Sequence, residues 1–95
     1  MRHFAVTQQH GPSWDDQRPL SGQDKWTEHA AFMNALAEDG AIVLGGPLVG
    51  GPRVLLIFDL ESEGEIRRRL AGDPWLAMGL ISLVSVEPWE ILLGN

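Results

Sequence analysis

The chain contains no cysteine, which excludes disulfide bonds, thiolate nucleophiles and thiolate metal sites. Basic residues are also scarce: 7 Lys and Arg stand against 13 Asp and Glu, for a net charge of −6. Nucleic-acid binding requires clustered positive charge, so we expect no nucleic-acid partner. The longest apolar run, 54–58, is far below the roughly 20 residues of a membrane-spanning helix. The first residues lack the apolar core of a signal peptide, so we expect a soluble, cytoplasmic protein without membrane association.

The length of the chain bounds its organisation. A chain of 95 residues is enough for one domain, and we interpret residues 1–95 as a single domain. A domain of this size buries only about 60–65% of the surface of its unfolded chain. Its own core is therefore thin, and burial against a second subunit would add to it.

Hydrophobic patterning and turn residues predict four strands and two helices. The strands are expected at 2–8, 41–44, 53–60 and 80–87, and the helices at 24–39 and 62–71. The order βαββαβ is typical of the ferredoxin-like α+β fold, which is an antiparallel sheet with both helices on one face.

Capping residues set the expected helix boundaries. Asp24 is the expected N-cap of the first helix, and Gly40 ends that helix as its left-handed residue. Ser62, with Glu65 three residues later, forms a capping box that opens the second helix. Glu65 is also expected to pair with Arg69, four residues further along.

The third expected strand is apolar on both faces, because residues 54–58 do not alternate with polar ones. An antiparallel sheet with one solvated face should alternate, and two helices cover only one face. We therefore expect a homodimer joined sheet to sheet. The alternative is that the strand is central and the C-terminal tail folds over it.

One histidine stands out because the first helix would bury it. At 100° per residue, His29 falls between Leu36 and Met33 on the apolar helix face. A buried imidazole needs a hydrogen-bond partner. The best candidate is Asp73, just beyond the second helix, because both helices of this fold pack on the same side of the sheet. Pro74 restricts Asp73 to an extended conformation, which fixes the direction of its carboxylate.

The chemistry of such a pair is proton transfer. A carboxylate bound to one imidazole nitrogen fixes the tautomer and raises the basicity of the other nitrogen. The free nitrogen of His29 can then move a proton to or from a substrate. Both residues also have structural interpretations, His29 as a hydrogen-bonded core histidine and Asp73 as a turn residue that stops a helix. The sequence leaves both interpretations open.

Metal and phosphate sites are not expected. His3, His10 and His29 lack the spacing of metal ligands on one element. The segment 45–47 is rich in glycine, but a strand and not a helix follows it, so it is no phosphate loop. A bulge at a strand end is its structural interpretation. Gly46 would also leave room for a ligand in a pocket wall.

The segment 9–24 is a long loop for so small a domain, and such loops often bind ligands or act as lids. Trp14 in this loop is expected to cover a pocket, or alternatively to pin the loop to the surface. Arg18, in the same loop, is a candidate for substrate binding. Trp75 is expected in the core or in the pocket wall.

These residues belong to an ordered set that resembles the YCII-related family (YciI-like proteins). The set comprises Trp26-x-x-His29-x-x-Phe32-x-x-x-Leu36-x-x-x-Gly40, Leu44-Gly45-Gly46-Pro47, Leu70-x-x-Asp73-Pro74-Trp75-x-x-x-Gly79-Leu80 and Val86-x-Pro88-Trp89. The resemblance covers residues 3–92, and the segment 9–24 departs from members with a shorter loop.

The resemblance implies a ferredoxin-like fold and dimers of the dimeric α+β barrel type, similar to muconolactone isomerases. In the family, a His and an Asp line a cleft and are regarded as an active-site pair. They fall here on His29 and Asp73. One characterised relative eliminates hydrogen chloride from a chlorinated hydroxyhydroquinone.

Two functions follow from the sequence. The first is an enzyme without a cofactor or metal, in which His29, oriented by Asp73, is the general acid/base for isomerisation or elimination on a small organic molecule. Such a molecule is a cyclic enol, a lactone or a hydroxylated aromatic. Arg18 or the backbone near Gly46 would stabilise a developing oxyanion, and Trp14 would cover the site. The alternative is a non-catalytic module that binds a small ligand or another protein.

Overall fold

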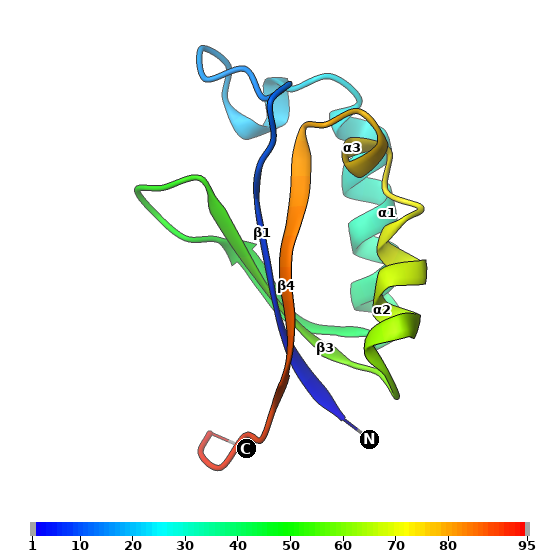
Figure 1. Ribbon diagram of the computed structural model, residues 1–95. Helices are drawn as coiled ribbons and strands as arrows, with labels where there is room; N and C mark the ends of the chain where they lie inside the picture. The colour runs from blue at the N-terminus through cyan, green and yellow to red at the C-terminus, as the bar shows by residue number, and fades with distance from the viewer. Residues whose placement is uncertain (1, 95) are drawn as a thin grey trace.

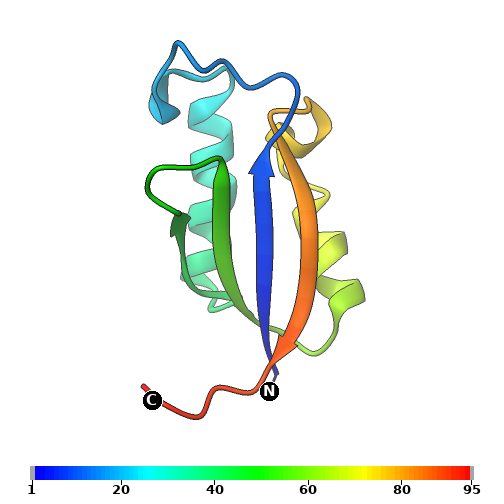
Figure 2. The same ribbon diagram turned by 60° about the vertical axis from the view of Figure 1, so that its left-hand side comes forward.

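The computed structural model describes residues 2–94. Its centre is an antiparallel sheet with strand order β2-β3-β1-β4. The strands are β1 (His3–His10), β2 (Ile42–Pro47), β3 (Arg53–Asp59) and β4 (Ile81–Trp89). The helices are α1 (Trp26–Glu38), α2 (Glu63–Leu70) and the short α3 (Pro74–Ala77), with a single 3-10 turn, η1 (Leu20–Gly22). Figures 1 and 2 show α1, α2 and α3 on one side of the sheet, so the predicted ferredoxin-like α+β fold is confirmed.

The core lies between the sheet and the helices α1 and α2. Along β1, Phe4 and Val6 point toward the helices, and each lies opposite a buried residue of β3, Phe58 and Leu56 respectively. None of the four is more than 3% exposed. Burying a side chain of this type contributes about 1.5–3 kcal/mol. The helices supply the other side of the core with Leu36, Ile66 and Leu70.

The start of α1 differs from the prediction. Asp24 is not the N-cap: the helix begins after Lys25, which has φ of +60° and makes no side-chain capping bond. Asp24 has other partners, because its carboxylate pairs with Arg18 and its carbonyl oxygen accepts a hydrogen bond from the indole of Trp75. The predicted end is correct, since Gly40 follows the helix with φ of +86°.

The second helix begins as its capping box predicts, with the Ser62 hydroxyl accepting the backbone N–H of Glu65 at 3.2 Å. The expected ion pair between Glu65 and Arg69 is wrong. Arg69 instead contacts Asp39, beyond the end of α1, at 2.9 Å. The partner of Arg69 is therefore set by the approach of the end of α1 to α2 in the fold, and not by the spacing of residues along α2. The helix α3, beyond the expected stop at residue 72, was not predicted.

The sheet face away from the helices, called the open face below, carries apolar residues. Ile57 of β3 lies on this face, because its neighbours Leu56 and Phe58 point into the core. Leu44 lies opposite Ile57 and is 70% exposed. The alternative in which the C-terminal tail covers the strand is not observed, since Leu92 and Leu93 are exposed and the tail extends away from the sheet (Figure 2). Within residues 2–94, the helices are too short or too polar to cross a membrane.

Candidate functional site

The side chains of His29 and Asp73 meet between α1 and α3. The Nδ1 atom of His29 lies 2.9 Å from Oδ1 and 3.0 Å from Oδ2 of Asp73. Both residues are buried, with His29 8% and Asp73 1% exposed. The expected approach of these two groups, which are 44 residues apart, is therefore present in the structure.

The position of Asp73 is set by its role at the start of α3. Its backbone is extended, with φ of −74° and ψ of 121°, as expected for a residue before proline. Oδ1 of Asp73 accepts the backbone N–H of Trp75 at 3.0 Å, which makes Asp73 the N-cap of this helix. The carboxylate is thus held by a backbone donor as well as by the imidazole, and its direction is fixed.

The contact defines the tautomer of His29. An ionised carboxylate only accepts hydrogen bonds, so Nδ1 of His29 carries the hydrogen in this contact. The other nitrogen, Nε2, makes no hydrogen bond with any residue in 2–94. When the ring is neutral, Nε2 holds a free lone pair that can accept a proton.

Aromatic rings surround this pair and extend to the long loop. The imidazole of His29 stacks on the indole of Trp75, with ring centroids 3.7 Å apart and an angle of 4° between the planes. Trp14 meets Trp75 edge to face at 5.6 Å, and His10 stacks on Trp14 at 3.7 Å. The ring centroid of Trp26 lies 5.8 Å from that of Trp75, with an angle of 44° between the planes. Such aromatic pairs contribute about 0.5–1.5 kcal/mol each beyond the buried area, so the rings stabilise one another in this wall.

A cavity of about 360 Å³ lies beside this wall, between α1, the β2–β3 hairpin and the end of β1. Its volume suits a small organic ligand. Helix α1 lines it with His29 and Met33, which were predicted on its apolar face, and with Trp26, Ala30, Asn34 and Ala37. Its other walls come from the four strands, α3, Trp14 and Leu20.

Three of the predicted binding residues, Trp14, Gly46 and Trp75, line this cavity. Trp75 is fully buried, and its indole N–H donates to the carbonyl oxygen of Asp24 at 2.6 Å. A Cβ atom at Gly46 would meet no atom within 4 Å, so this glycine borders open space. Gly45 is different, because a Cβ there would lie 2.7 Å from Leu56.

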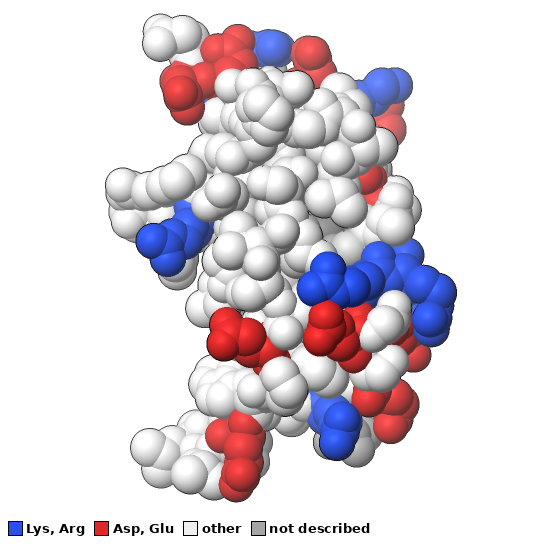
Figure 3. Space-filling view, viewed as in Figure 1, with Lys and Arg blue, Asp and Glu red and all other residues white. Residues whose placement is uncertain are grey.

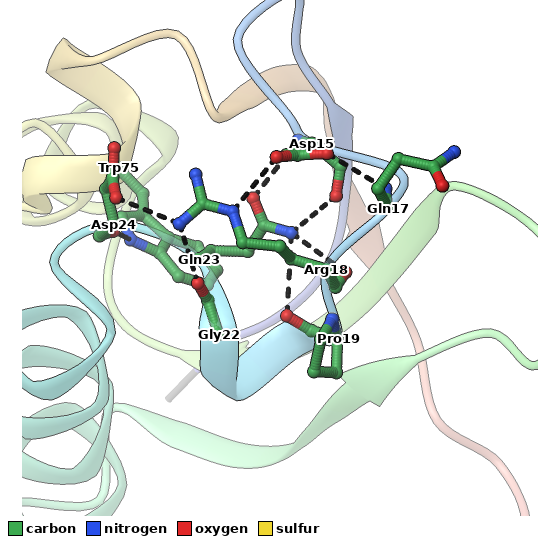
Figure 4. A network of polar contacts seen from close by, with 8 residues as sticks. All are labelled: Asp15, Gln17, Arg18, Pro19, Gly22, Gln23, Asp24 and Trp75. Atoms are coloured by element: carbon green, nitrogen blue, oxygen red, sulfur yellow. Dashed lines mark hydrogen bonds and ion pairs between the residues drawn. The ribbon is translucent and has the colours of Figure 1, made fainter.

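Arg18 was expected to bind the substrate, but it is not among the residues that line the cavity. Its Nε atom lies 2.9 Å from Asp15 and its Nη1 atom 3.1 Å from Asp24, on the surface of the loop (Figure 4). The hydrogen bonds to these two carboxylates raise the pKa of the Arg18 guanidinium. Two acidic neighbours within six residues thus bind the guanidinium before it reaches a ligand, and the sequence interpretation overlooked them.

The long loop is built around Gln23. This side chain is 3% exposed, donates to the carbonyl oxygen of Asp15 at 2.7 Å and accepts the backbone N–H of the same residue at 3.1 Å (Figure 4). At its root, Gly11 donates its backbone N–H to Leu80 at 2.8 Å. The loop that presents Trp14 is therefore fixed at both ends by hydrogen bonds.

Three further polar residues line the cavity that sequence reasoning did not assign to the site, Gln8 and His10 of β1 and Asn34 of α1. Burial lowers the pKa of His10, and the nearby Asp16 carboxylate partly offsets this shift. Gln8 and His10 could have been found from the alternation of β1, because they share one strand face with Phe4 and Val6. Among residues 2–94, no cluster of His, Asp and Glu is suited to hold a metal ion.

Comparisons with known proteins agree with this architecture. The sequence profile of the YCII-related domain matches residues 4–90. No curated protein matches the chain significantly. A similar solved structure is that of 5-chloro-2-hydroxyhydroquinone dehydrochlorinase from Burkholderia phenoliruptrix AC1100, in complex with 2,5-dihydroxybenzoquinone. The two are 25% identical, the match covers 92% of this chain and 93% of the other, and the TM-score is 0.65.

Proposed function

We propose that this chain, which belongs to the family of YCII-related domains, is a cofactor-independent enzyme that moves a proton on a small organic molecule. The observation that carries the proposal is the contact between His29 Nδ1 and the Asp73 carboxylate at 2.9 Å, in a histidine that also lines a cavity. General acid–base catalysis requires an imidazole that is oriented on one side and free on the other. His29 meets both conditions.

Two reaction types fit this arrangement. In each, Nε2 of His29 accepts a proton from a carbon beside a carbonyl group, and the electron pair of the broken C–H bond forms an enolate. In an isomerisation, His29 returns the proton to another atom of the same molecule. In an elimination, the electron pair forms a C=C bond and expels a neighbouring leaving group, such as chloride, with its bonding pair.

We propose that the substrate is a hydroxylated ring that carries a carbonyl group, either in its stable form or in one of its tautomers. The similar solved protein is a dehydrochlorinase of a hydroxyhydroquinone, and its structure contains a dihydroxybenzoquinone. The cavity of about 360 Å³ and its aromatic wall suit a ring of that size. With Arg18 bound to Asp15 and Asp24, the backbone near Gly46 is the remaining candidate to stabilise a developing oxyanion.

We also propose that the protein forms a homodimer through the open face of the sheet. Leu44 is 70% exposed there, and Val84 of β4 is 52% exposed. Apolar side chains exposed on one sheet face are stabilised when a second copy covers them. In the view of Figure 3, which is that of Figure 1 with the helices at the right, charged side chains gather toward the two ends and over α2.

Chloride release from 5-chloro-2-hydroxyhydroquinone under anaerobic conditions tests the enzymatic proposal. We expect turnover by the native chain and a loss of about 10²–10⁴-fold in His29→Gln, which keeps a donor for Asp73 but removes the base. His3→Gln is the matched control, because His3 lies on β1 outside the cavity.

Equal turnover in the native chain and His29→Gln would reject His29 as the base. Binding of the ring compound without chemical change, in a native chain that melts at a higher temperature with it, would instead favour the ligand-binding module. No turnover and no binding would reject the proposed substrate class.

A further inference from the structure

Gln8 is the most deeply buried polar side chain in the wall of the cavity. It is 1% exposed, and it lies on the central strand β1, on the sheet face that points toward the helices. Neither its amide nitrogen nor its amide oxygen has a hydrogen-bond partner among residues 2–94. It lines the same cavity as His29.

The neighbours of Gln8 explain why its amide stays unpaired. In the sheet, Gln8 lies opposite Val54 of β3 and Leu83 of β4, and both of these pack against the apolar core. Neither side chain offers a hydrogen bond. A buried amide without a partner destabilises a fold, whereas Met or Leu would fill the same volume without that cost. A function at this position must therefore offset the loss of stability.

The other polar side chains of the cavity differ from Gln8. His29 is bound to Asp73 through Nδ1, and the ring of His10 is stacked on Trp14. Asn34 also lines the cavity, but its side chain is on an exposed position of α1. Of these two amides in the wall, only that of Gln8 offers a donor and an acceptor from a buried position.

We propose that the Gln8 amide recognises a hydroxyl group and a carbonyl group on one edge of the ligand ring. Its nitrogen donates to the ligand carbonyl oxygen, and its oxygen accepts from the ligand hydroxyl group. This inference rests on the proposed function and narrows its substrate class to planar rings that carry both groups. It makes Gln8 a specificity-determining residue, with the proton transfer left to His29.

The adjacent residue offers a matched control. Gln9 precedes His10 on the same strand but points to the opposite face of the sheet, where it lies opposite Arg53 and is exposed. Gln8→Met and Gln9→Met therefore remove the same amide from the two faces of one strand. Only the first change alters the cavity.

The test measures calorimetric binding of 2,5-dihydroxybenzoquinone and of its dimethyl ether in acidic buffer, because the hydroxyl groups of this quinone are acidic and donate a hydrogen bond only while protonated. The dimethyl ether keeps the ring and both carbonyl groups but has no hydroxyl hydrogen. We expect Gln8→Met to weaken binding of the dihydroxy compound at least about tenfold, because both hydrogen bonds are lost. Gln9→Met should bind it as the native chain does. For the dimethyl ether, the affinities of the native chain and of Gln8→Met should differ by a smaller factor, because only the hydrogen bond to the carbonyl oxygen remains to be lost.

Thermal unfolding of the free variants and NMR of the native chain complete the test. Gln8→Met should melt at a higher temperature than the native chain, because it removes an unpaired buried amide. In the native chain, the side-chain amide resonances of Gln8 should shift when the dihydroxy compound is added, while those of Gln9 should not. This second measurement remains decisive if Gln8→Met fails to fold.

Equal affinity of Gln8→Met and the native chain, or an unmoved Gln8 resonance in a bound native chain, would overturn the role of Gln8 and leave the role of His29 standing. Absence of binding by the native chain would overturn both, because the narrower inference depends on the broader one.

Discussion

The imidazole of His29 lies parallel to the indole of Trp75, with their centroids 3.7 Å apart. Trp75 also donates its backbone N–H to Asp73, the carboxylate that binds His29. One residue thus packs against the proposed base and helps to orient the carboxylate that fixes its tautomer. The geometry of the pair depends on α3 as a unit, and not only on the two ionisable groups.

Replacing Trp75 with Phe tests this dependence. Trp75→Phe keeps an aromatic ring on His29 but loses the hydrogen bond from the indole to the carbonyl oxygen of Asp24. We expect a loss of about 1–3 kcal/mol in the free energy of unfolding, from the unpaired carbonyl and the missing ring volume. Urea denaturation measures it. Trp89→Phe, at a side chain 46% exposed, should change stability by less than about 0.5 kcal/mol and is the control.

Replacing Asp73 with Asn separates its structural role from its chemical role. In Asp73→Asn, the side-chain oxygen of the new amide can still accept the Trp75 N–H, so α3 keeps its N-cap. The amide nitrogen would donate to Nδ1 of His29, which moves the imidazole hydrogen to Nε2 and removes the basic lone pair from the cavity. We expect turnover to fall by about 10²–10⁴-fold while the melting temperature changes little. Near-native turnover in a folded Asp73→Asn would contradict the role assigned to the carboxylate.

The sequence predicted the fold because its signals are local. The strands alternate or are apolar, Ser62 caps one helix, and Gly40 ends the other. The meeting of His29 and Asp73 was also predictable, since the fold places both helices on one face and a buried imidazole needs a partner. Periodicity and chain topology together were sufficient for that contact.

Contacts that depend on competition between neighbours were not predictable. Arg18 was expected at the ligand, but Asp15 and Asp24 lie closer to it and bind its guanidinium. Gln8 was overlooked because a glutamine in a strand carries no motif. Its meaning appears only when the apolar neighbours Val54 and Leu83 are known from the register.

The adjacent glycines of β2 should respond differently to alanine. A Cβ at Gly45 would lie 2.7 Å from Leu56, so Gly45→Ala should destabilise the protein by about 1–3 kcal/mol. A Cβ at Gly46 would meet nothing within 4 Å, so Gly46→Ala should fold normally. Gly46 lies opposite Leu55, on the same strand face as Leu44, so the added methyl group points to the open face and should leave binding of 2,5-dihydroxybenzoquinone unchanged. Thermal unfolding measures the difference in stability, calorimetry measures binding, and equal melting temperatures for both variants would contradict the packing argument.

The stability of the protein should depend on His10 in mildly acidic solution. Burial lowers the pKa of His10 from its ordinary value of 6.5, so the unfolded chain takes up the proton at a higher pH than the folded one. Folding therefore loses stability as the pH falls below about 6.5, until the folded protein also binds the proton. We expect the difference in melting temperature between about pH 7.5 and pH 5.5 to be smaller in His10→Gln than in the native chain. An unchanged difference would show that His10 does not titrate differently in the two states.

The proposed dimer can be tested by placing a charge on the open face. Leu44→Lys puts an ammonium group on a side chain that is 70% exposed and lies opposite Ile57. If a second copy covers this face, the buried charge destabilises the pair, and light scattering should give a monomer mass where the native chain gives a dimer. Met78→Lys, at the end of α3 on the helix side, adds the same charge elsewhere and should leave the dimer intact. A native chain that is monomeric at micromolar concentration, or a dimer that survives Leu44→Lys, contradicts assembly through the open face.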